Sequence, residues 1–394
     1  MERVLITGLG VVSCLGSGTD AFWRGLSVAP SRPEKVRGVH ADMELPLRYT
    51  VADADLPAQL DRPDGAGLGR ASRLAVEAAR QAVIDAAFPE VPPSRLGIVV
   101  GTLMGETDLH EQWRGDPVTA RQRWTRTFTI ASTIGDSLGA CGANASISNA
   151  CAAGGYALGI AADMIRCGEA DVVVAGGADT YSYSRAALNR MGAIDPVRCR
   201  PFDLHRRGIS PGEGAALLVF ESESHALRRQ VPTVYARLAG SGWSCDARQS
   251  AAPEPTSAQI VRATRQALAD AGASPDSIGC VIPHGTGSEA NDVMESRALR
   301  EVFGARCMDV PLYSLKARIG HTGGGAGAFA VLAAALILRH RVVPPNALLD
   351  EQDPECRVWI PQGGEVPLVS ERVMVNAHAS GGNGAALILV SAAA

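Results

Sequence analysis

The sequence predicts an α/β protein assembled from two similar halves, each with helices packed on a β-sheet. Helical patterns alternate with short β-branched strands, such as residues 171–175 and residues 372–376, and this alternation favours parallel-type sheets covered by helices. Apolar residues make up 46% of the 394-residue chain, aromatic residues only 5%, and glycine is abundant. A core of small and aliphatic side chains suits tightly packed α/β layers better than a β-sandwich.

Internal repeats indicate that the two halves are duplicates. Three pairs of similar segments occur in the same order along the chain: residues 78–86 with 263–271, 149–155 with 319–325, and 212–219 with 382–389. The first pair is identical at six of nine positions, and the other two pairs share an offset of 170 residues. This offset predicts equivalent positions for Cys151 and His321, and a pseudo-twofold axis would bring their glycine-rich turns face to face.

The boundary between the halves is predicted near residue 240. Residues 102–147 show few strand signals, and we interpret them as an insertion that could cap a site. The expected units are therefore residues 1–240, which contain the insertion and Cys151, and residues 241–394, which contain His321.

Composition excludes several classes of protein. A formal net charge of −4 provides no basic field for nucleic acid. The nine cysteines include no C-x-x-C pair, so a disulfide framework or zinc ribbon is disfavoured and a reducing, cytoplasmic location is expected. The N-terminus lacks the sustained apolar region of a signal peptide. The longest clearly apolar run, residues 329–338, has ten residues and is too short to span a bilayer.

Cys151 is the first candidate for chemistry. It lies where a strand is expected to end and a helix to begin, among alanines and glycines that leave room for a substrate. A helix N-terminus favours the thiolate through its dipole and its unpaired N–H groups. Taken alone, a cysteine is more often a small buried hydrophobe than a nucleophile.

Two further motifs change that balance. His284 follows an expected strand end, and the Thr286 and Ser288 hydroxyls two and four residues later could bind a polar ligand chain. Lys316 and His321 lie in a second glycine-rich segment. Each motif alone would be more simply explained by a structural turn, a surface lysine or a helix-capping histidine.

Together the motifs resemble those of the β-ketoacyl-acyl-carrier-protein synthases, the elongating condensing enzymes of the thiolase superfamily, over nearly the whole chain. The matching segments are residues 4–13, 149–151, 174–178, 200–203, 212–214 and 284–286, with Lys316 and residues 320–321. The resemblance implies a duplicated thiolase-like fold of five α-β-α-β-α layers, usually dimeric.

The resemblance also implies roles for individual residues. Cys151 would take an acyl chain as a thioester, with its backbone N–H serving the oxyanion. His284 and His321 would assist malonyl decarboxylation by hydrogen-bonding the enolate, a role for which imidazole N–H donors are suited. Lys316 would support this pair, with Glu295 as its partner. Thr286 and Ser288 would contact the phosphopantetheine arm, and no metal or other cofactor is implied.

The chain departs from the family pattern near its C-terminus. The family motif there commonly contains two phenylalanines, and His378 and Ser380 occupy their positions. The second phenylalanine gates the acyl pocket, so both residues are candidates for substrate binding, and the backbone N–H of Ser380 could still complete the oxyanion hole. A threonine usual in a carrier-arm loop is Ala251. These changes favour a specialised or polyketide-type synthase over a housekeeping fatty-acid synthase.

An acidic acyl carrier protein is the implied partner, in a homodimer or in a heterodimer with a ketosynthase-like subunit. Candidate docking residues are Arg70, Arg73, Arg206 and Arg207. Two alternatives stay open: an initiating acyltransferase that uses Cys151 without decarboxylation, and a subunit that only shapes a partner's pocket, although such subunits lack the cysteine. A dehydrogenase is disfavoured because the third glycine of a dinucleotide fingerprint is replaced by Ser13. A papain-like hydrolase is disfavoured by the two histidines and the lysine.

Overall fold

The fold was analysed in a computed structural model. The structure describes residues 2–28, 33–35, 47–56, 67–88, 90–109, 126–180, 186–248 and 254–392. Ala251, singled out from the sequence, lies outside these residues.

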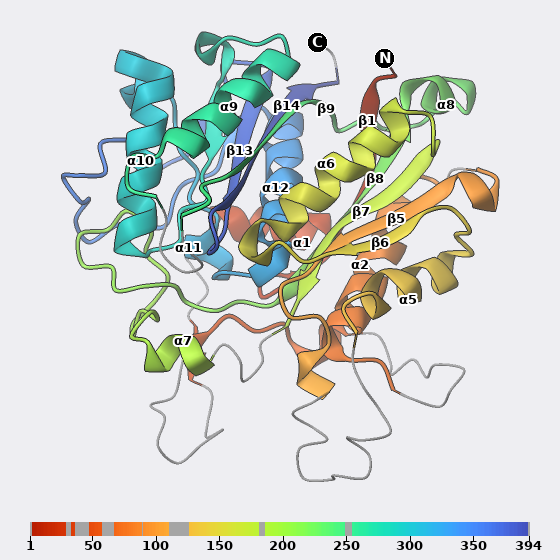
Figure 1. Cartoon of the computed structure of the whole chain (residues 1–394), viewed down its shortest axis with the longest axis horizontal. Coiled ribbons are helices and arrows are strands. Elements are labelled where there is room, and N and C mark those ends of the chain that lie inside the picture. Colours follow the sequence, from red (N-terminus) through yellow and green to blue (C-terminus); the bar gives the residue numbers. More distant parts are fainter. Residues whose placement is uncertain are drawn as a thin grey trace.

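The described part of the chain alternates strands and helices, and Figure 1 shows their arrangement. The strands are β1 (Val4–Ser13), β2 (Gly16–Ser17), β3 (Glu34–Lys35), β4 (Leu47–Arg48), β5 (Leu96–Gly101), β6 (Asn144–Ile147), β7 (Val172–Asp179), β8 (Gly214–Ser222), β9 (Ala236–Cys245), β10 (Cys280–Ile282), β11 (Val342–Val343), β12 (Val366–Pro367), β13 (Arg372–His378) and β14 (Asn383–Ser391). The helices are α1 (Thr19–Ser27), α2 (Arg70–Asp85), α5 (Thr129–Leu138), α6 (Ala153–Arg166), α7 (Ala186–Arg190), α8 (Glu223–Arg228), α9 (Ala258–Asp270), α10 (Glu289–Phe303), α11 (Lys316–Ile319) and α12 (Ala326–His340). Short 3₁₀ turns include η3 (Ala150–Ala152) and η7 (Gly323–Gly325).

The main sheet confirms the duplication. Its strands follow the order β10-β13-β14-β9-β1-β8-β7-β5-β6. In the first half the strand order is β6-β5-β7-β8-β1. In the second half the order β10-β13-β14-β9 corresponds to β5-β7-β8-β1. Leu312, which bridges Val281 in β10, takes the place of β6. The two halves join where β1 pairs with β9, so they form one continuous path.

The expectation of parallel sheets is only partly right. β5 pairs parallel with β6 and β7, and β10 pairs parallel with β13. β8 runs antiparallel to both β7 and β1, and β14 runs antiparallel to both β13 and β9. Each half therefore contains one reversed strand, which helix–strand alternation alone does not reveal.

Helices complete the five predicted layers. α2 and α5 cover the outer face of the first half, and α9 and α10 cover the outer face of the second. α6 and α12 lie between the two halves and contact strands of both. One core cluster occupies this central layer, and a further cluster lies beneath each outer layer.

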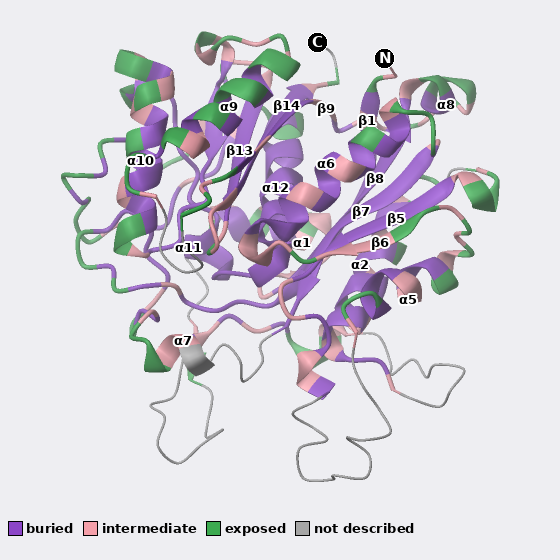
Figure 2. Cartoon of the chain, in the orientation of Figure 1, coloured by how far each residue is buried: buried purple, intermediate pink, exposed green. Residues whose placement is uncertain are grey.

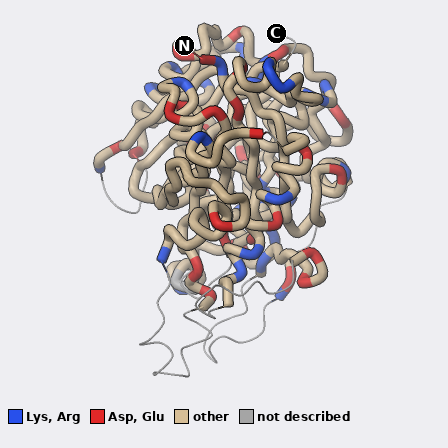
Figure 3. The backbone as a smooth tube through the Cα atoms, turned by 90° about the vertical axis from the view of Figure 1, so that its right-hand side faces the viewer, with Lys and Arg blue, Asp and Glu red and all other residues tan. Residues whose placement is uncertain are grey.

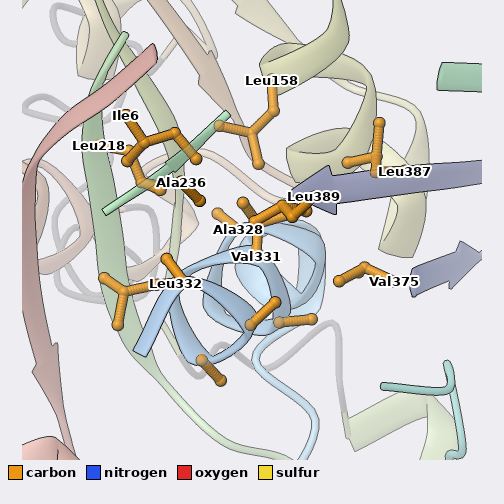
Figure 4. Close-up of a cluster of buried hydrophobic side chains, with 14 of the residues drawn as sticks. Ile6, Leu158, Leu218, Ala236, Ala328, Val331, Leu332, Val375, Leu387 and Leu389 are labelled. Atoms are coloured by element: carbon orange, nitrogen blue, oxygen red, sulfur yellow. The ribbon is translucent and has the colours of Figure 1, made fainter. Parts of the chain in front are cut away.

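α12 is the centre of the core. It is apolar on all sides, and residues 326–338 are all buried (Figure 2); a helix without a polar face is stable only where it is enclosed. Ala328, Val331 and Leu332 pack against side chains of both halves, including Leu218 and Leu389 (Figure 4).

The segment Gly323–His340 corrects one expectation about membranes. Within the described residues it is long and apolar enough to span a bilayer by length and composition, so the estimate of a ten-residue run was too short. Its window is 89% buried inside the protein, as expected of a core helix in the central layer.

The equivalence of Cys151 and His321 is wrong by three residues. η3 and α6 begin at residues 150 and 153, and η7 and α12 begin at 323 and 326, an offset of 173. Cys151 therefore corresponds to Gly324. The predicted face-to-face approach is present, because a Cβ at Gly154 would lie 2.7 Å from the Gly324 carbonyl oxygen and one at Gly327 would lie 2.5 Å from the Gly155 nitrogen.

Most of the described part of the proposed cap, residues 102–147, is not a cap. α5 packs on α2 and β5, and β6 is the edge strand beside β5, so residues 129–147 belong to the α/β layers. Residues 110–125 lie outside the described residues. The boundary expected at residue 240 falls inside β9.

Candidate active site

Cys151 occupies the turn that opens α6. It lies in η3, whose first residue, Ala150, has φ of 48°, a strained value for a residue with a side chain. The Cys151 side chain is partly exposed, whereas residues 152–155 behind it are buried. Ala152 packs against Ala377 in β13, and η3 contacts η7. The cysteine therefore stands where elements of the two halves meet.

His284 lies in the loop after β10 and is buried and firmly held. Its backbone N–H and that of Gly285 donate to the two carboxylate oxygens of Glu295, at 2.7 and 2.8 Å. The ammonium of Lys316 donates to the His284 carbonyl oxygen and lies 3.5 Å from His284 Nδ1. Nδ1 thus faces a cation and acts as the acceptor, which leaves the proton on Nε2.

His321 has the same tautomer for a different reason. The Gly323 N–H donates to His321 Nδ1 at 3.2 Å, so Nε2 carries the proton of the neutral ring. The His321 backbone is fixed by bonds to Ser210 and Gly212. The His284 and His321 rings lie 5.6 Å apart at 85°, so the two imidazoles are neighbours in one site.

Burial disfavours the protonated forms of His284 and Lys316. It depresses the pKa of His284 well below its ordinary value, with the Lys316 charge as the next cause. Burial also lowers the pKa of Lys316, and the neighbouring Glu295, Cys199 and Cys151 oppose this shift. Cys151 is therefore within electrostatic reach of the ammonium, and His284 is neutral at physiological pH.

Glu295 supports the site mainly through the backbone rather than as a direct partner of Lys316. Its oxygens accept the two N–H groups of the His284 loop and, at 3.1 Å, the Asn376 side chain. Burial raises the pKa of Glu295, and these donors and the charge of Lys316 oppose the shift.

Thr286 and Ser288 lie together at the start of α10. Their hydroxyl oxygens are 3.0 Å apart; Thr286 is buried and Ser288 is partly exposed. The Thr286 and Gly287 N–H groups donate to Asp292, whose pKa burial raises to about 6. Sequence reasoning assigned no role to Asp292. Its spacing of three residues from Glu295 could have revealed it, because that spacing puts both carboxylates on one helix face, towards this loop.

His378 brings a third imidazole to the site. It ends β13 with its ring 5.5 Å from that of His284, and among the described residues its buried Nδ1 has no hydrogen-bond partner. Burial lowers its pKa to about 3. It lines a small, half-open pocket with Ser257, Ile260 and Met294. Ser380 lies in the exposed turn between β13 and β14.

The predicted docking arginines do not form one exposed patch. Arg70 is tied to Glu213 and Asp53, each at 2.8 Å. Arg206 is buried and pairs with Asp353 at 2.6 Å and with Asp292 at 3.5 Å.

These two arginines therefore act as structural ion pairs, and a docking role for them does not fit their positions. Arg73 is half-buried and Arg207 is exposed. Basic and acidic residues alternate over the face seen in Figure 3.

Comparison with known proteins agrees with the architecture. The model of the β-ketoacyl synthase N-terminal domain matches residues 1–226, and that of the C-terminal domain matches residues 235–350. The fold is that of the thiolase-like acyltransferases that condense acyl groups. Within that class, the chain belongs to the β-ketoacyl synthase family, as its motifs predicted.

Individual relatives span almost the full chain. Nodulation protein E of Rhizobium meliloti is 33% identical over 98% of this chain and 98% of its own. The tetracenomycin polyketide synthase ketoacyl synthase alpha subunit of Streptomyces glaucescens is 32% identical over 97% of this chain and 94% of its own. The solved structure of the ishigamide ketosynthase/chain length factor has a TM-score of 0.90 and 34% identity, covering 99% of both chains.

Proposed function

We propose that this chain elongates acyl groups by decarboxylative Claisen condensation, with Cys151 as nucleophile and His284 and His321 as enolate-stabilising donors. The observation that carries the proposal is the pair of imidazoles 5.6 Å apart, each with its proton directed to Nε2 by a different neighbour. Such a pair is suited to an oxygen that becomes negative during the reaction.

The first half-reaction is acyl transfer. The Cys151 thiolate attacks the thioester carbonyl of an acyl carrier protein, and the carbonyl oxygen becomes an oxyanion. The backbone N–H groups of Cys151 and Ser380 donate to it. The oxyanion collapses, the bond to the carrier sulfur breaks, and the carrier thiolate leaves and takes up a proton. The acyl group remains as a thioester on Cys151.

The second half-reaction forms the carbon–carbon bond. The malonyl carboxylate leaves as CO₂, and its bonding electrons move into the thioester as an enolate whose oxygen accepts from His284 and His321 Nε2–H. The enolate carbon then attacks the acyl carbon on Cys151, and the Cys151 thiolate leaves. Each donor of this kind typically contributes about 10²–10³ in rate.

Lys316 serves this step by holding His284 in position and in its tautomer. Its ammonium contacts both the carbonyl oxygen and Nδ1 of His284. It also disfavours protonation of the ring. Since proton and tautomer are fixed before substrate arrives, little reorganisation is needed as charge develops.

Substrates, partners and location follow from relatives that make polyketides. We propose an acyl carrier protein as donor of both substrates, in polyketide or specialised fatty-acid synthesis, with a cytoplasmic location. The ishigamide relative, a ketosynthase/chain length factor, supports a heterodimer with a related subunit, and a homodimer is the other arrangement to test. No metal or organic cofactor takes part in either half-reaction as written.

The altered loop favours one alternative worth separating, an initiating acyltransferase that does not decarboxylate malonyl groups. His378 and Ser380 stand where the family pattern has phenylalanines, so the histidine pair could serve a different acceptor. Release of CO₂ from malonyl carrier protein distinguishes the two functions, because only the elongating enzyme requires it.

The decisive experiment is intact-protein mass spectrometry after incubation with a panel of acyl carrier proteins. The native protein should gain one acyl group, Cys151→Ala should gain none, and the control Cys141→Ala, which alters an exposed cysteine, should behave as the native protein. Acylation that persists in Cys151→Ala, or an absence of CO₂ release from malonyl carrier protein, would overturn the elongation proposal.

A further inference from the structure

We propose that Asp179 is a positioning residue that fixes the turn after His321 and thereby the direction of the His321 Nε2–H. The consequence for decarboxylation rests on the function proposed above. The structural part, control of the His321 ring by Asp179, stands independently.

Asp179 ends β7 and is fully buried. One carboxylate oxygen accepts from the Thr102 hydroxyl at 2.9 Å and from the Met104 N–H at 3.1 Å. The other accepts from the Leu103 N–H at 2.8 Å and from the Gly324 N–H. Three of the four donors are backbone groups, so the carboxylate holds two chain segments at once.

Those segments belong to different halves of the molecule. The loop 102–104 follows β5 in the half that carries Cys151, whereas Gly324 lies in η7, three residues after His321. The approach is close, because a Cβ at Gly324 would lie 2.4 Å from the Leu103 nitrogen. Asp179 therefore fixes the His321 turn relative to the half that bears the nucleophile.

The link to chemistry is the neighbouring glycine. The Gly323 N–H donates to His321 Nδ1 at 3.2 Å, and the next N–H along the chain, that of Gly324, donates to Asp179. Gly323 has φ of 62°, a conformation that glycine adopts and leaves easily. The turn has bonds of its own, since the Gly325 N–H donates to the Thr322 carbonyl oxygen and the Ala326 N–H donates to that of Gly323. Asp179 adds a fixed point from the other half of the molecule, which keeps the Gly323 N–H aimed at the ring.

A carboxylate suits this position because the four neighbours named above are all donors. An asparagine side chain has one oxygen and one NH₂ group. The NH₂ group would replace one carboxylate oxygen and would face two N–H or O–H donors instead of accepting from them. In Asp179→Asn the NH₂ group must face one of the two donor pairs, and repulsion between these hydrogens pushes residue 179 away either from Gly324 or from the loop 102–104 that holds it. In both cases the link between Gly324 and this loop loosens, whereas Thr102→Val introduces no such repulsion. His321 would then lose the restraint on its tautomer and direction while its ring remains in place.

The kinetic test separates the two half-reactions. Asp179→Asn should lower decarboxylation of malonyl carrier protein about 10- to 100-fold, less than the roughly 10²–10³ of losing a whole donor. Acylation of Cys151, which does not use His321, should stay within about threefold of native. An unchanged ratio of decarboxylation to acylation in Asp179→Asn would overturn the proposal.

Thr102→Val is the matched control. It removes one of the four bonds to Asp179 but leaves the Gly324 bond intact, so the ratio should stay within about twofold of native. A Thr102→Val variant whose ratio falls as far as that of Asp179→Asn would contradict a specific role for the Gly324 contact.

A spectroscopic readout tests the structural part without any turnover. The ¹⁵N signals of His321 in protein labelled at histidine should report an Nε2–H ring in the native protein and a mixture of tautomers in Asp179→Asn. Signals unchanged in the variant would overturn the assignment, whether or not the protein condenses acyl groups.

If Asp179→Asn does not fold, Asp179→Glu takes its place. Glutamate keeps the charge but moves the oxygens by about one bond length, so the ratio should fall at least threefold and the His321 signals should shift. A folded Asp179→Glu with native ratio and native signals would overturn the proposal.

Discussion

Acid should destabilise this protein in part through His378, and replacing that residue should remove a defined share of the loss. His378 is 6% exposed, and burial lowers its pKa from 6.5 to about 3. In the unfolded chain the imidazole regains its ordinary pKa. Between those two values the unfolded state therefore binds more protons than the folded state, and stability falls as pH falls.

The size of the effect follows from the two pKa values. Well inside the window, one extra proton on the unfolded chain lowers the free energy of unfolding by about 1.4 kcal/mol per pH unit. Integrated from pH 7 to pH 5, the loss is about 2 kcal/mol. The folded pKa hardly affects this figure as long as it stays below about 4. A typical domain is stable by only about 5–15 kcal/mol, so the change is measurable.

The assay is urea unfolding of the native protein and His378→Phe at pH 7, 6 and 5. Phenylalanine fills a similar volume and does not titrate, so the stability of the variant relative to native should rise by about 2 kcal/mol from pH 7 to pH 5. His284 remains in both proteins and contributes to both curves. Leu227→Gln, a change at an exposed residue that does not titrate, should leave the pH dependence as it is. Parallel curves for native protein and His378→Phe would refute the reasoning.

Three further outcomes concern the reaction. His284→Ala and His321→Ala should each slow decarboxylation of malonyl carrier protein by about 10²–10³, and native rates in either variant would contradict the donor roles. Ser380→Phe should suppress bulky acyl groups more than short linear ones in parallel acylation assays, and an equal effect on both would remove the gate hypothesis. Arg207→Glu should weaken carrier binding, and added salt should weaken binding to the native protein, because exposed charges are screened over about 8 Å at physiological ionic strength; titrations indifferent to both changes would contradict electrostatic docking.

The sequence predicted the duplicated fold because helices and strands repeat with recognisable local patterns. It did not predict the orientation of β8 and β14, since a reversed strand has the same pattern of buried residues as a parallel one. The offset between the halves was misplaced for a similar reason. Glycine-rich turns resemble one another at several registers, and only the helix starts at Ala153 and Ala326 fix the alignment.

The residues that support the site were the hardest to predict. Arg206 looks like a surface charge in sequence, yet its partner Asp353 lies 147 residues away. Asp179 likewise receives the Gly324 N–H from 145 residues away. Such pairs depend on how the two halves pack, and no local spacing of residues in the sequence predicts them. Cys151, His284 and His321 could be predicted as candidates because each lies in a motif of its own.

The contact between Gly154 and Gly327 has a consequence for how this enzyme can change. At that point the two central helices meet through backbone alone, and any side chain would collide with the opposite main chain. This backbone contact sets the spacing between the Cys151 turn and the His321 turn. Even the smallest side chain at Gly154 or Gly327 would force the two helices apart. We therefore expect new acyl preferences to arise away from this contact, at candidate substrate-binding positions such as His378 and Ser380. A mutant library for altered substrate range is best restricted to such positions, with Gly154 and Gly327 left unchanged.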